Sequence, residues 1–507
     1  MVAFPQETLI QIFEELIDDS RNLKYCSAHD LLSYMLVNHE WHRAASQILW
    51  RDPFIFIKDM KQHSSLIAIY LQCLPEVSRV RIAKRGIQMD SVSTKPPIFD
   101  YPAMLKRLDW AKMYLSLSAW LLSQKKNLYT ISEDSRGFLM VLAALMKNFV
   151  NKASIKHLII KGMEVDQIDK VGLLIFAENK DSSSAQDFLR NLTSLRLTSD
   201  VRAFKPETAK SLIRFADICH KIEELVITSS DTYDQVWEAV IKAQTNLRRL
   251  SVHGYHHKMP LTQEALRDNG QNLTHLRVPA SCISMDAFVN CSNLQYLDVT
   301  NHNMEDGMLQ LLNSSFPKLE HFFLNSDKRD DRFHFFSMDQ DLPPTDKSLP
   351  HLSKFIRNTY GSLKTIDVVS YARDIDSDAL LEYSSEVAKC CPELSYYRGF
   401  FAITRLSDLF RQCPHLNSVI ILDDSYDFCD ISSSLQESGE FIPKNLGVLT
   451  IPQRFKYSPK ALDSFLESCL KKSIDGLSMR LFNSDNSRLV KIMKKYKKKY
   501  VVDSYTD

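Results

Sequence analysis

A short apolar segment of the form Leu-x-x-Leu-x-Leu recurs along most of this chain. Clear copies begin at Leu247, Leu273 and Leu294, where the fourth and sixth positions are also aliphatic. Twelve copies, the first, ninth and last of them degenerate, begin at residues 155, 192, 222, 247, 273, 294, 319, 363, 394, 416, 446 and 474. Their average spacing of about 29 residues is long enough for one strand and one helix.

The segments between the copies are typical of helices. Pro206 stands where a helix begins, and Pro317, Pro392 and Pro414 come just before a copy, where proline ends a helix. A doubly wound sheet would also alternate strands and helices, but a constant strand motif on an irregular spacing favours a solenoid. We therefore predict an α/β leucine-rich-repeat fold, a curved parallel sheet with helices on the convex side.

The first 54 residues follow a different pattern. Leu9, Ile12, Phe13, Leu16 and Ile17 form one apolar stripe of a helix. Leu31, Leu32, Met35 and Leu36 mark a second helix, and Asn38 suits the N-cap of a third one. The third helix carries Trp41, Ala44, Ala45, Ile48 and Leu49. Three short helices cannot bury this much apolar surface internally, so some of it should contact the repeats or another protein.

This N-terminal pattern resembles the F-box. The resemblance rests on Phe4-Pro5-x-Glu7-x-Leu9-x-x-Ile12-Phe13, Leu31-Leu32, Val37-Asn38, Trp41 and Ile48-Leu49-Trp50. It departs at the first position, where Phe4 replaces leucine, and in a longer loop between the first two helices. With the repeats, the chain resembles the F-box/leucine-rich-repeat families expanded in fungi.

The resemblance implies a substrate receptor of a cullin–RING (SCF-type) ubiquitin ligase without catalytic residues of its own. The F-box would bind the small adaptor of the ligase, and the repeats would bind the target protein. Candidate adaptor-binding residues are Phe4, Pro5, Glu7, Leu9, Ile12, Leu31, Leu32, Val37 and Trp41, although Leu16, Trp41 and Ile48 fit a purely structural role equally well. The alternative is a scaffold whose N-terminal helices only cap the solenoid. Burial of Leu9, Ile12, Leu31 and Leu32 against residues 55–150 would favour that alternative.

We expect four regions: an F-box-like module over 1–54, a helical linker or cap over 55–150, the solenoid over 151–485 and a basic helix or tail over 486–507. The apolar windows at 113–124 and 137–146 are too short to span a bilayer and predict buried helices. The beginning lacks the pattern of a secretory signal, and the ten cysteines include no Cys-x-x-Cys pair. These features predict reduced thiols and a cytoplasmic and/or nuclear location.

Composition excludes several classes of function. Only 12 residues are glycine, and the closest two, Gly439 and Gly447, are eight positions apart. Rossmann, Walker A and nucleophile-elbow motifs each need two glycines much closer together. The 63 basic and 62 acidic residues nearly cancel, so no global charge favours nucleic acid or a membrane. We expect no cofactor and no metal.

The side chains between the buried positions of each strand should form the receptor surface, because strand residues alternate in direction. Candidate substrate-binding residues are Arg196, Arg249, His275, Arg277, Tyr296, Asp298, His321, Phe323 and Asp367. Arginine and aromatic residues are frequent hot spots of protein interfaces, and the cationic donors suit an acidic or phosphorylated segment. A solvated sheet face without a partner is the other interpretation.

Other polar clusters fit ordinary surface roles better than sites. His39 and His42, the group His253, His256 and His257, and the acidic run from Asp423 to Asp430 lack the ligand number or the glycine that a metal site needs. The run Lys494–Lys499 suits a solvated helix end better than a nuclear-import patch. The long interval around 325–350 fits a functional or a disordered loop equally well.

Overall fold

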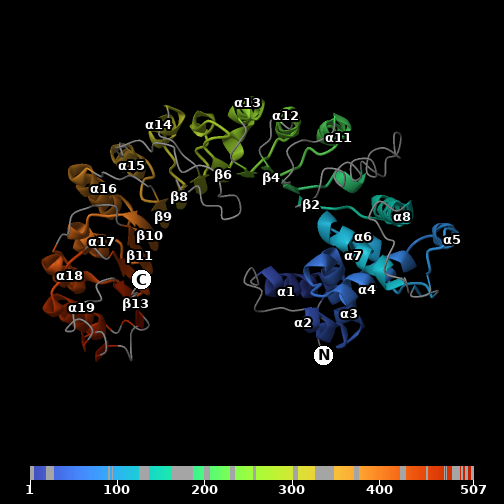
Figure 1. The fold of residues 1–507 in the computed structure, drawn as a ribbon, viewed down its shortest axis with the longest axis horizontal. Coiled ribbons are helices and arrows are strands. Elements are labelled where there is room, and N and C mark those ends of the chain that lie inside the picture. Colours follow the sequence, from blue (N-terminus) through green and yellow to red (C-terminus); the bar gives the residue numbers. More distant parts are fainter. Residues whose placement is uncertain are drawn as a thin grey trace. The chain divides into compact units, whose positions relative to one another are not determined.

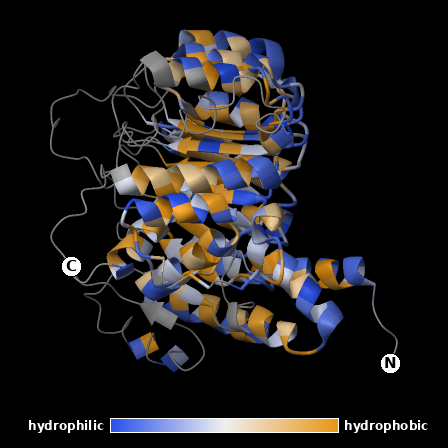
Figure 2. Ribbon diagram, turned by 90° about the vertical axis from the view of Figure 1, so that its right-hand side faces the viewer, coloured by the Kyte–Doolittle hydropathy of each residue, from blue (hydrophilic) through white to orange (hydrophobic). Residues whose placement is uncertain are grey.

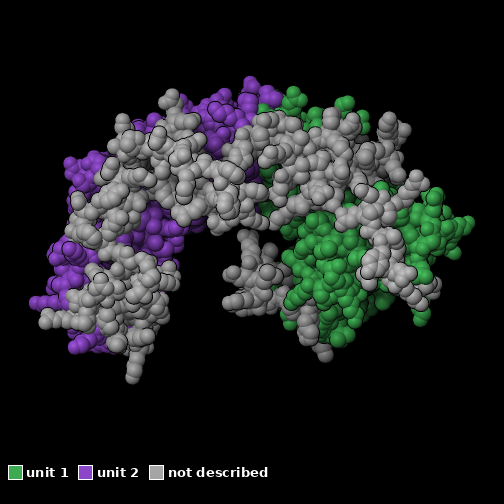
Figure 3. Space-filling model, viewed as in Figure 1, with its two compact units in different colours: residues 1–247 green, residues 248–507 purple. Residues whose placement is uncertain are grey.

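The computed structural model describes residues 5–18, 28–89, 92–93, 95–124, 136–161, 187–198, 206–228, 234–254, 258–300, 306–325, 348–369, 376–422, 430–452, 455–472, 474, 477–481, 491–492, 495–496 and 501–503. The chain divides into two compact units, Met1–Leu247 and Arg248–Asp507 (Figure 3). Each unit is described by itself.

Unit 1 begins with the three predicted helices, which are followed by further helices and a short parallel sheet (Figure 1). Its sheet runs in the order β1-β2-β3-β4, with every pairing parallel. The helices are α1 (Gln6–Asp18), α2 (Ala28–Met35), α3 (His39–Arg51), α4 (Met60–Gln72), α5 (Glu76–Lys84), α6 (Tyr101–Met104), α7 (Trp110–Gln124), α8 (Arg136–Lys152), α11 (Pro206–Ala216) and α12 (Asp234–Lys242), with a 3-10 turn, η2 (Pro53–Ile55). The strands are β1 (Arg107–Asp109), β2 (His157–Lys161), β3 (Ser194–Thr198) and β4 (Glu224–Thr228).

The N-terminal helices are joined to the sheet of unit 1 by polar contacts at the end of α3. The Lys106 N–H donates to the Arg51 carbonyl at 2.9 Å, and the Lys112 ammonium donates to the Phe54 carbonyl at 3.0 Å. Arg107 Nε lies 3.4 Å from Asp52 Oδ2. The first strand therefore begins where the N-terminal helices end.

Unit 2 is a parallel sheet in which the strands follow one another in chain order, from β5 to β14. Helices lie on the outer side of its arc and strands on the inner side (Figure 1). The strands are β5 (Arg249–His253), β6 (His275–Pro279), β7 (Tyr296–Thr300), β8 (His321–Asn325), β9 (Thr365–Val369), β10 (Tyr396–Phe400), β11 (Ser418–Leu422), β12 (Val448–Ile451), β13 (Ser478–Leu481) and β14 (Val501–Asp503). The helices are α13 (Pro260–Asn269), α14 (Asp306–Leu312), α15 (Ser348–Arg357), α16 (Ser377–Cys390), α17 (Leu406–Gln412), α18 (Ser432–Ser438) and α19 (Pro459–Lys471). The 3-10 turns described in this unit are η5 (Gly270–Asn272), η6 (Met285–Phe288), η7 (Ile403–Arg405) and η8 (Gly439–Phe441).

The predicted fold class is confirmed, because each copy of the repeat places a strand in a parallel sheet, and helices or 3-10 turns alternate with these strands along the described residues. In β5 and β6 the apolar positions Leu250, Val252, Leu276 and Val278 are buried, as alternation requires. Even the degenerate copies form strands, β2, β10 and β13. The helices carry hydrophobic and hydrophilic residues side by side, as helices with one buried side do (Figure 2).

Two strands lie beyond the predicted limits of the sheet. β1 pairs with β2, and β14 pairs with β13. The sequence Leu105-Lys-Arg-Leu108-Asp-Trp110 is a repeat with tryptophan at its last position, and all three apolar residues are buried. At the other end, Val501 and Val502 follow the basic run and add a strand, as β-branched residues favour.

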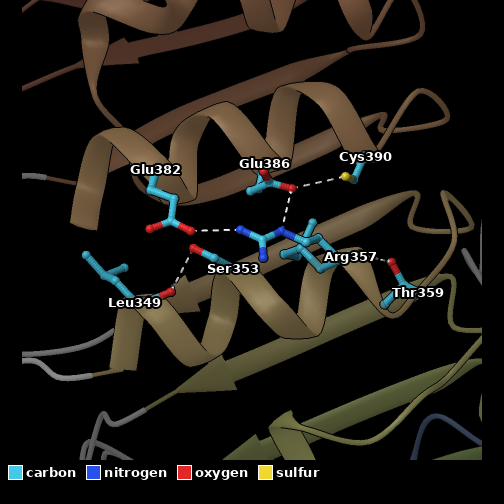
Figure 4. A network of polar contacts seen from close by, with 8 residues as sticks. Leu349, Ser353, Arg357, Thr359, Glu382, Glu386 and Cys390 are labelled. Atoms are coloured by element: carbon cyan, nitrogen blue, oxygen red, sulfur yellow. Dashed lines mark hydrogen bonds and ion pairs between the residues drawn. The ribbon is translucent and has the colours of Figure 1, made fainter. Parts of the chain in front are cut away.

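On the outer side of unit 2, neighbouring helices are joined by polar contacts. The Arg357 guanidinium of α15 lies between Glu382 and Glu386 of α16, at 2.7 and 2.9 Å from their carboxylates (Figure 4). The Cys390 thiol donates to Glu386 at 3.4 Å. These contacts connect consecutive repeats at their surface.

The predicted buried helices are confirmed, since α7 and α8 cover the two apolar windows and bury Trp120, Leu142 and Leu145. Within the described residues, no helix is long and apolar enough to cross a membrane. The eight described cysteines are all free, and seven of them are buried.

Candidate functional site

The three N-terminal helices share a small core of their own. Its buried members are Leu9, Phe13, Leu31, Ala44, Ala45 and Ile48. Phe13 of α1 stacks on Tyr34 of α2 at 5.0 Å, and the Trp41 ring of α3 meets Phe13 edge-on at 5.4 Å. The predicted cap is confirmed, because the Trp41 N–H donates to Asn38 Oδ1 at 2.9 Å.

The apolar stripe of α1 divides between the core and the surface. Leu9 and Phe13 point inward, whereas Ile12 and Leu16 are 41% and 39% exposed. On α2, Leu31 is buried and the adjacent Leu32 is 50% exposed, followed by Leu36 at 88% and Val37 at 56%. Ile12, Leu16, Leu32, Leu36 and Val37 are named here the exposed F-box residues. They leave an apolar surface that the core of the three helices does not use.

The predicted adaptor-binding residues therefore differ in their positions. Pro5 and Glu7 are exposed at the beginning of α1, and Trp41 is half-buried. Leu9 and Leu31 are buried in the core of the three helices. Phe4 lies outside the described residues. Leu16 and Leu36 were predicted only as apolar residues of helices, and they also belong to the exposed F-box residues. No pattern in the sequence distinguishes these two leucines from buried ones.

Side chains between the buried strand positions form two rows on the inner side of unit 2, named here the strand face. Strand pairing aligns Arg249, His275, Tyr296, His321 and Thr365 in one row. The other row consists of Ser251, Arg277, Asp298, Phe323 and Asp367. Both rows continue onto β10, as Tyr396 and Arg398. The degenerate copy at 394 gave no firm alignment, so these last two residues were not predicted.

Ion pairs across the strands neutralise most arginines of the predicted receptor surface. Arg277 Nε lies 3.2 Å from Asp298 Oδ2, and Arg398 lies 3.8 Å from Asp367. In unit 1, Arg196 pairs with Glu224 at 2.6 Å. Most of the cationic donors predicted for the receptor surface are therefore paired with carboxylates. Arg249, the first residue of β5, is exposed.

Burial shifts the ionisation of the strand face. Desolvation raises the pKa of Asp298, and Arg277 opposes that rise. Desolvation also raises the pKa of Asp367, with Arg398 acting against it. The pKa of His275 is lowered, first by burial and then by Arg249. The imidazole of His275 is therefore neutral at pH 7.

The polar clusters considered from the sequence have ordinary partners where the structure describes them. His42 Nδ1 lies 3.1 Å from the Met35 carbonyl, and His253 Nε2 lies 3.3 Å from Ser251 Oγ. Lys495 contacts Asp463 of α19 at 2.9 Å. His256, His257, residues 423–429 and the 326–347 segment lie outside the described residues. Among those described, no three His, Cys, Asp or Glu side chains are placed to hold a metal ion.

Comparisons with known proteins concern the N-terminal segment and the fold of the chain. Residues 2–56 match the F-box-like family. A chain from the crystal structure of the Rad7 and Elc1 complex in yeast is similar over 84% of this chain and 94% of its own, at 13% identity and a TM-score of 0.39. No curated protein matches the chain. Its N-terminal segment, residues 2–56, is thus an F-box-like domain.

Proposed function

We propose that this chain is a non-catalytic substrate receptor of a cullin–RING (SCF-type) ubiquitin ligase, in which the F-box-like domain binds the adaptor. One observation carries the proposal. The exposed F-box residues are five large aliphatic side chains on a domain whose core is complete without them. Several large apolar side chains left exposed on a domain this small favour a protein interaction site.

The direct contacts are assigned to the exposed members of the predicted set: Pro5, Glu7, Ile12, Leu32, Val37 and the accessible edge of Trp41. Leu9 and Leu31 act through packing, because they fix the angle at which α1 and α2 present these residues. Phe4 belongs to the proposed surface by its position in the F-box pattern.

In this proposal the repeats bind the target protein through the strand face. The ligase would then contribute proximity between the target and the ubiquitin-conjugating enzyme, which needs no catalytic residue in this chain. We also propose the four regions 1–54, 55–150, 151–485 and 486–507, membership of the fungal F-box/leucine-rich-repeat families, and a cytoplasmic and/or nuclear location.

The test is co-expression of the full chain with the adaptor of cullin–RING ligases, followed by pull-down. An Ile12→Asp, Leu32→Asp double variant should lose adaptor capture, because both charges stand on exposed positions and leave the core intact. The matched control is Val77→Asp with Leu122→Asp, two exposed aliphatic residues of α5 and α7 in the same unit. Undiminished capture by the first variant would refute the proposal.

A scaffold whose N-terminal helices only cap the repeats is the second candidate. The contacts of Asp52, Arg51 and Phe54 with residues 106–112 favour it, since they attach the helices to the first strand. They use the end of α3, however, and not the exposed residues of α1 and α2. Failure of the wild-type chain to bind the adaptor would favour the scaffold.

A further inference from the structure

The strand face carries a nearly symmetric arrangement of charges around one aromatic residue. From β6 to β10, the paired positions are Arg277, Asp298, Phe323, Asp367 and Arg398. Each aspartate pairs with the arginine on its outer side. Phe323 therefore lies between the two ion pairs. In each pair the aspartate is on the strand next to Phe323, and the arginine is one strand farther away.

Exposure decides which sign of charge a ligand meets. The Arg277 side chain is 55% exposed and its partner Asp298 only 10%. Arg398 is 41% exposed and Asp367 only 18%. The carboxylates thus lie beneath the guanidinium groups, and the accessible surface is cationic although the formal charges cancel. Each guanidinium group carries five N–H donors, so an arginine paired with one carboxylate can still donate to a ligand.

An aromatic cluster joins Phe323, which lies between the two ion pairs, to rings of the neighbouring row. The Tyr296 ring stacks on His275 at 5.8 Å, with 13° between the ring planes. It lies 5.1 Å from the Phe323 ring and 6.1 Å from His321. The Tyr296 hydroxyl donates to Asp298 at 3.4 Å, which fixes the ring. All four rings are half-buried, so each keeps an accessible part for an apolar side chain.

The distance between Arg277 and Arg398 indicates how long a bound segment must be to reach both. β6 and β10 are four strand spacings apart, roughly 19 Å at about 4.8 Å each. An extended peptide that crosses the strands covers this distance in about six residues. Side chains of an extended peptide alternate in direction, so the residue two positions from the one above Arg277 faces the sheet again, roughly 7 Å along and above Tyr296 and Phe323.

We infer that the strand face of β6–β10 binds an extended segment of another protein that carries two acidic side chains about six residues apart, with an aromatic or aliphatic side chain two residues from the acidic one that meets Arg277. The apolar side chain packs on Tyr296 and Phe323, and the acidic side chains accept hydrogen bonds from Arg277 and Arg398. The inference rests on the proposed function in one respect: the bound segment is taken to be part of the protein that the ligase targets.

A nucleic acid is the less suitable ligand for this face. Its phosphates repeat at short, regular intervals and need a continuous row of cations. Here the cations stand at the two ends, with buried carboxylates and rings between them. Charge complementarity therefore favours the acidic protein segment.

The experiment measures binding of three fluorescent peptides to the full chain by anisotropy. The first has two aspartates six positions apart and a phenylalanine two positions from one of them, with glycine and serine between them. In the second, lysine replaces both aspartates, and in the third alanine replaces phenylalanine. We expect the first to bind at least about tenfold more tightly than either of the others, a difference of about 1.4 kcal/mol, since the second loses both acidic anchors and the third loses the apolar one.

Protein variants then locate the site. Arg277→Gln with Arg398→Gln should weaken the first peptide about tenfold. The matched control is Arg267→Gln with Arg357→Gln, which removes two arginines that are also ion-paired but lie on the helix side. Equal losses in both double variants would overturn the inference, as would tighter binding of the lysine peptide or of a short oligothymidylate, or no peptide binding at all. Adaptor capture measured on the same samples separates the two proposals, because it depends on the exposed F-box residues alone.

Discussion

The Asp52 carboxylate lies 3.4 Å from Arg107 Nε, joining the residue that ends α3 to the strand that begins the sheet of unit 1. Burial raises the pKa of Asp52 from 3.8 to about 6, while Arg107 and Lys112 act in the opposite direction. The ion pair thus only partly offsets the cost of removing the carboxylate from water.

The stability of unit 1 should consequently fall as pH rises from about 4 to about 6. The folded chain holds the Asp52 proton above the pH at which the unfolded chain releases it, so deprotonation favours unfolding in this window. Asp52→Asn should lack this fall. The measurement is urea unfolding of both proteins across the window. The control for loss of one negative charge is Glu76→Gln on α5. If the stability of Asp52→Asn falls with pH as that of the wild type does, the prediction is contradicted.

Leu31 and Leu32 are neighbours in sequence with opposite exposure, which makes them a matched pair. Leu31→Ala should cost about 2–5 kcal/mol, because it leaves a cavity beside Phe13 in the core of the F-box-like domain. Leu32→Ala should change stability by less than about 0.5 kcal/mol, yet weaken adaptor binding. Thermal unfolding and pull-down of both variants check this. If both lose equal stability, the assigned faces of α2 are wrong.

Leu250 tests the register of the repeats in unit 2. Its side chain is buried in β5, between the strand-face residues Arg249 and Ser251. Leu250→Ala should destabilise unit 2 by about 2–5 kcal/mol in chemical unfolding. Ser251→Ala, one residue along and half-buried on the strand face, should cost far less. Comparable losses of stability in Leu250→Ala and Ser251→Ala would indicate that the assigned inward and outward sides of β5 are wrong.

The Arg357 contacts should contribute little to stability despite their short distances. Arg357 and Glu382 are both about half exposed, where screening by water limits an ion pair to about 1 kcal/mol or less. Arg357→Gln should therefore lower the stability of unit 2 by no more than that, and less in high salt. A loss as large as that from Leu250→Ala would show that this network holds the repeats together.

Local patterns in the sequence were sufficient for the secondary structure. The repeat predicts each strand from β2 to β13 because two apolar residues separated by one position bury one side of a strand wherever it lies. The Asn38 cap was likewise predictable, since it depends only on the residues of the next turn. β1 was not predicted, because Trp110 stands at the last position of its repeat, where the other copies have an aliphatic residue. β14 was not predicted, because the preceding lysines favoured a helix end.

The sequence by itself thus determined the α/β repeat, the three F-box helices and the rows of residues on the strand face. Tertiary structure alone decided which half of an apolar stripe faces out, because Leu9 and Ile12 are equivalent until α3 packs against α1. It also decided that Arg277 and Arg398 lie above buried aspartates, since residues 21 and 31 positions apart become neighbours only when their strands pair. Periodicity is a property of nearby residues, whereas exposure and charge pairing depend on residues that the chain brings together from a distance.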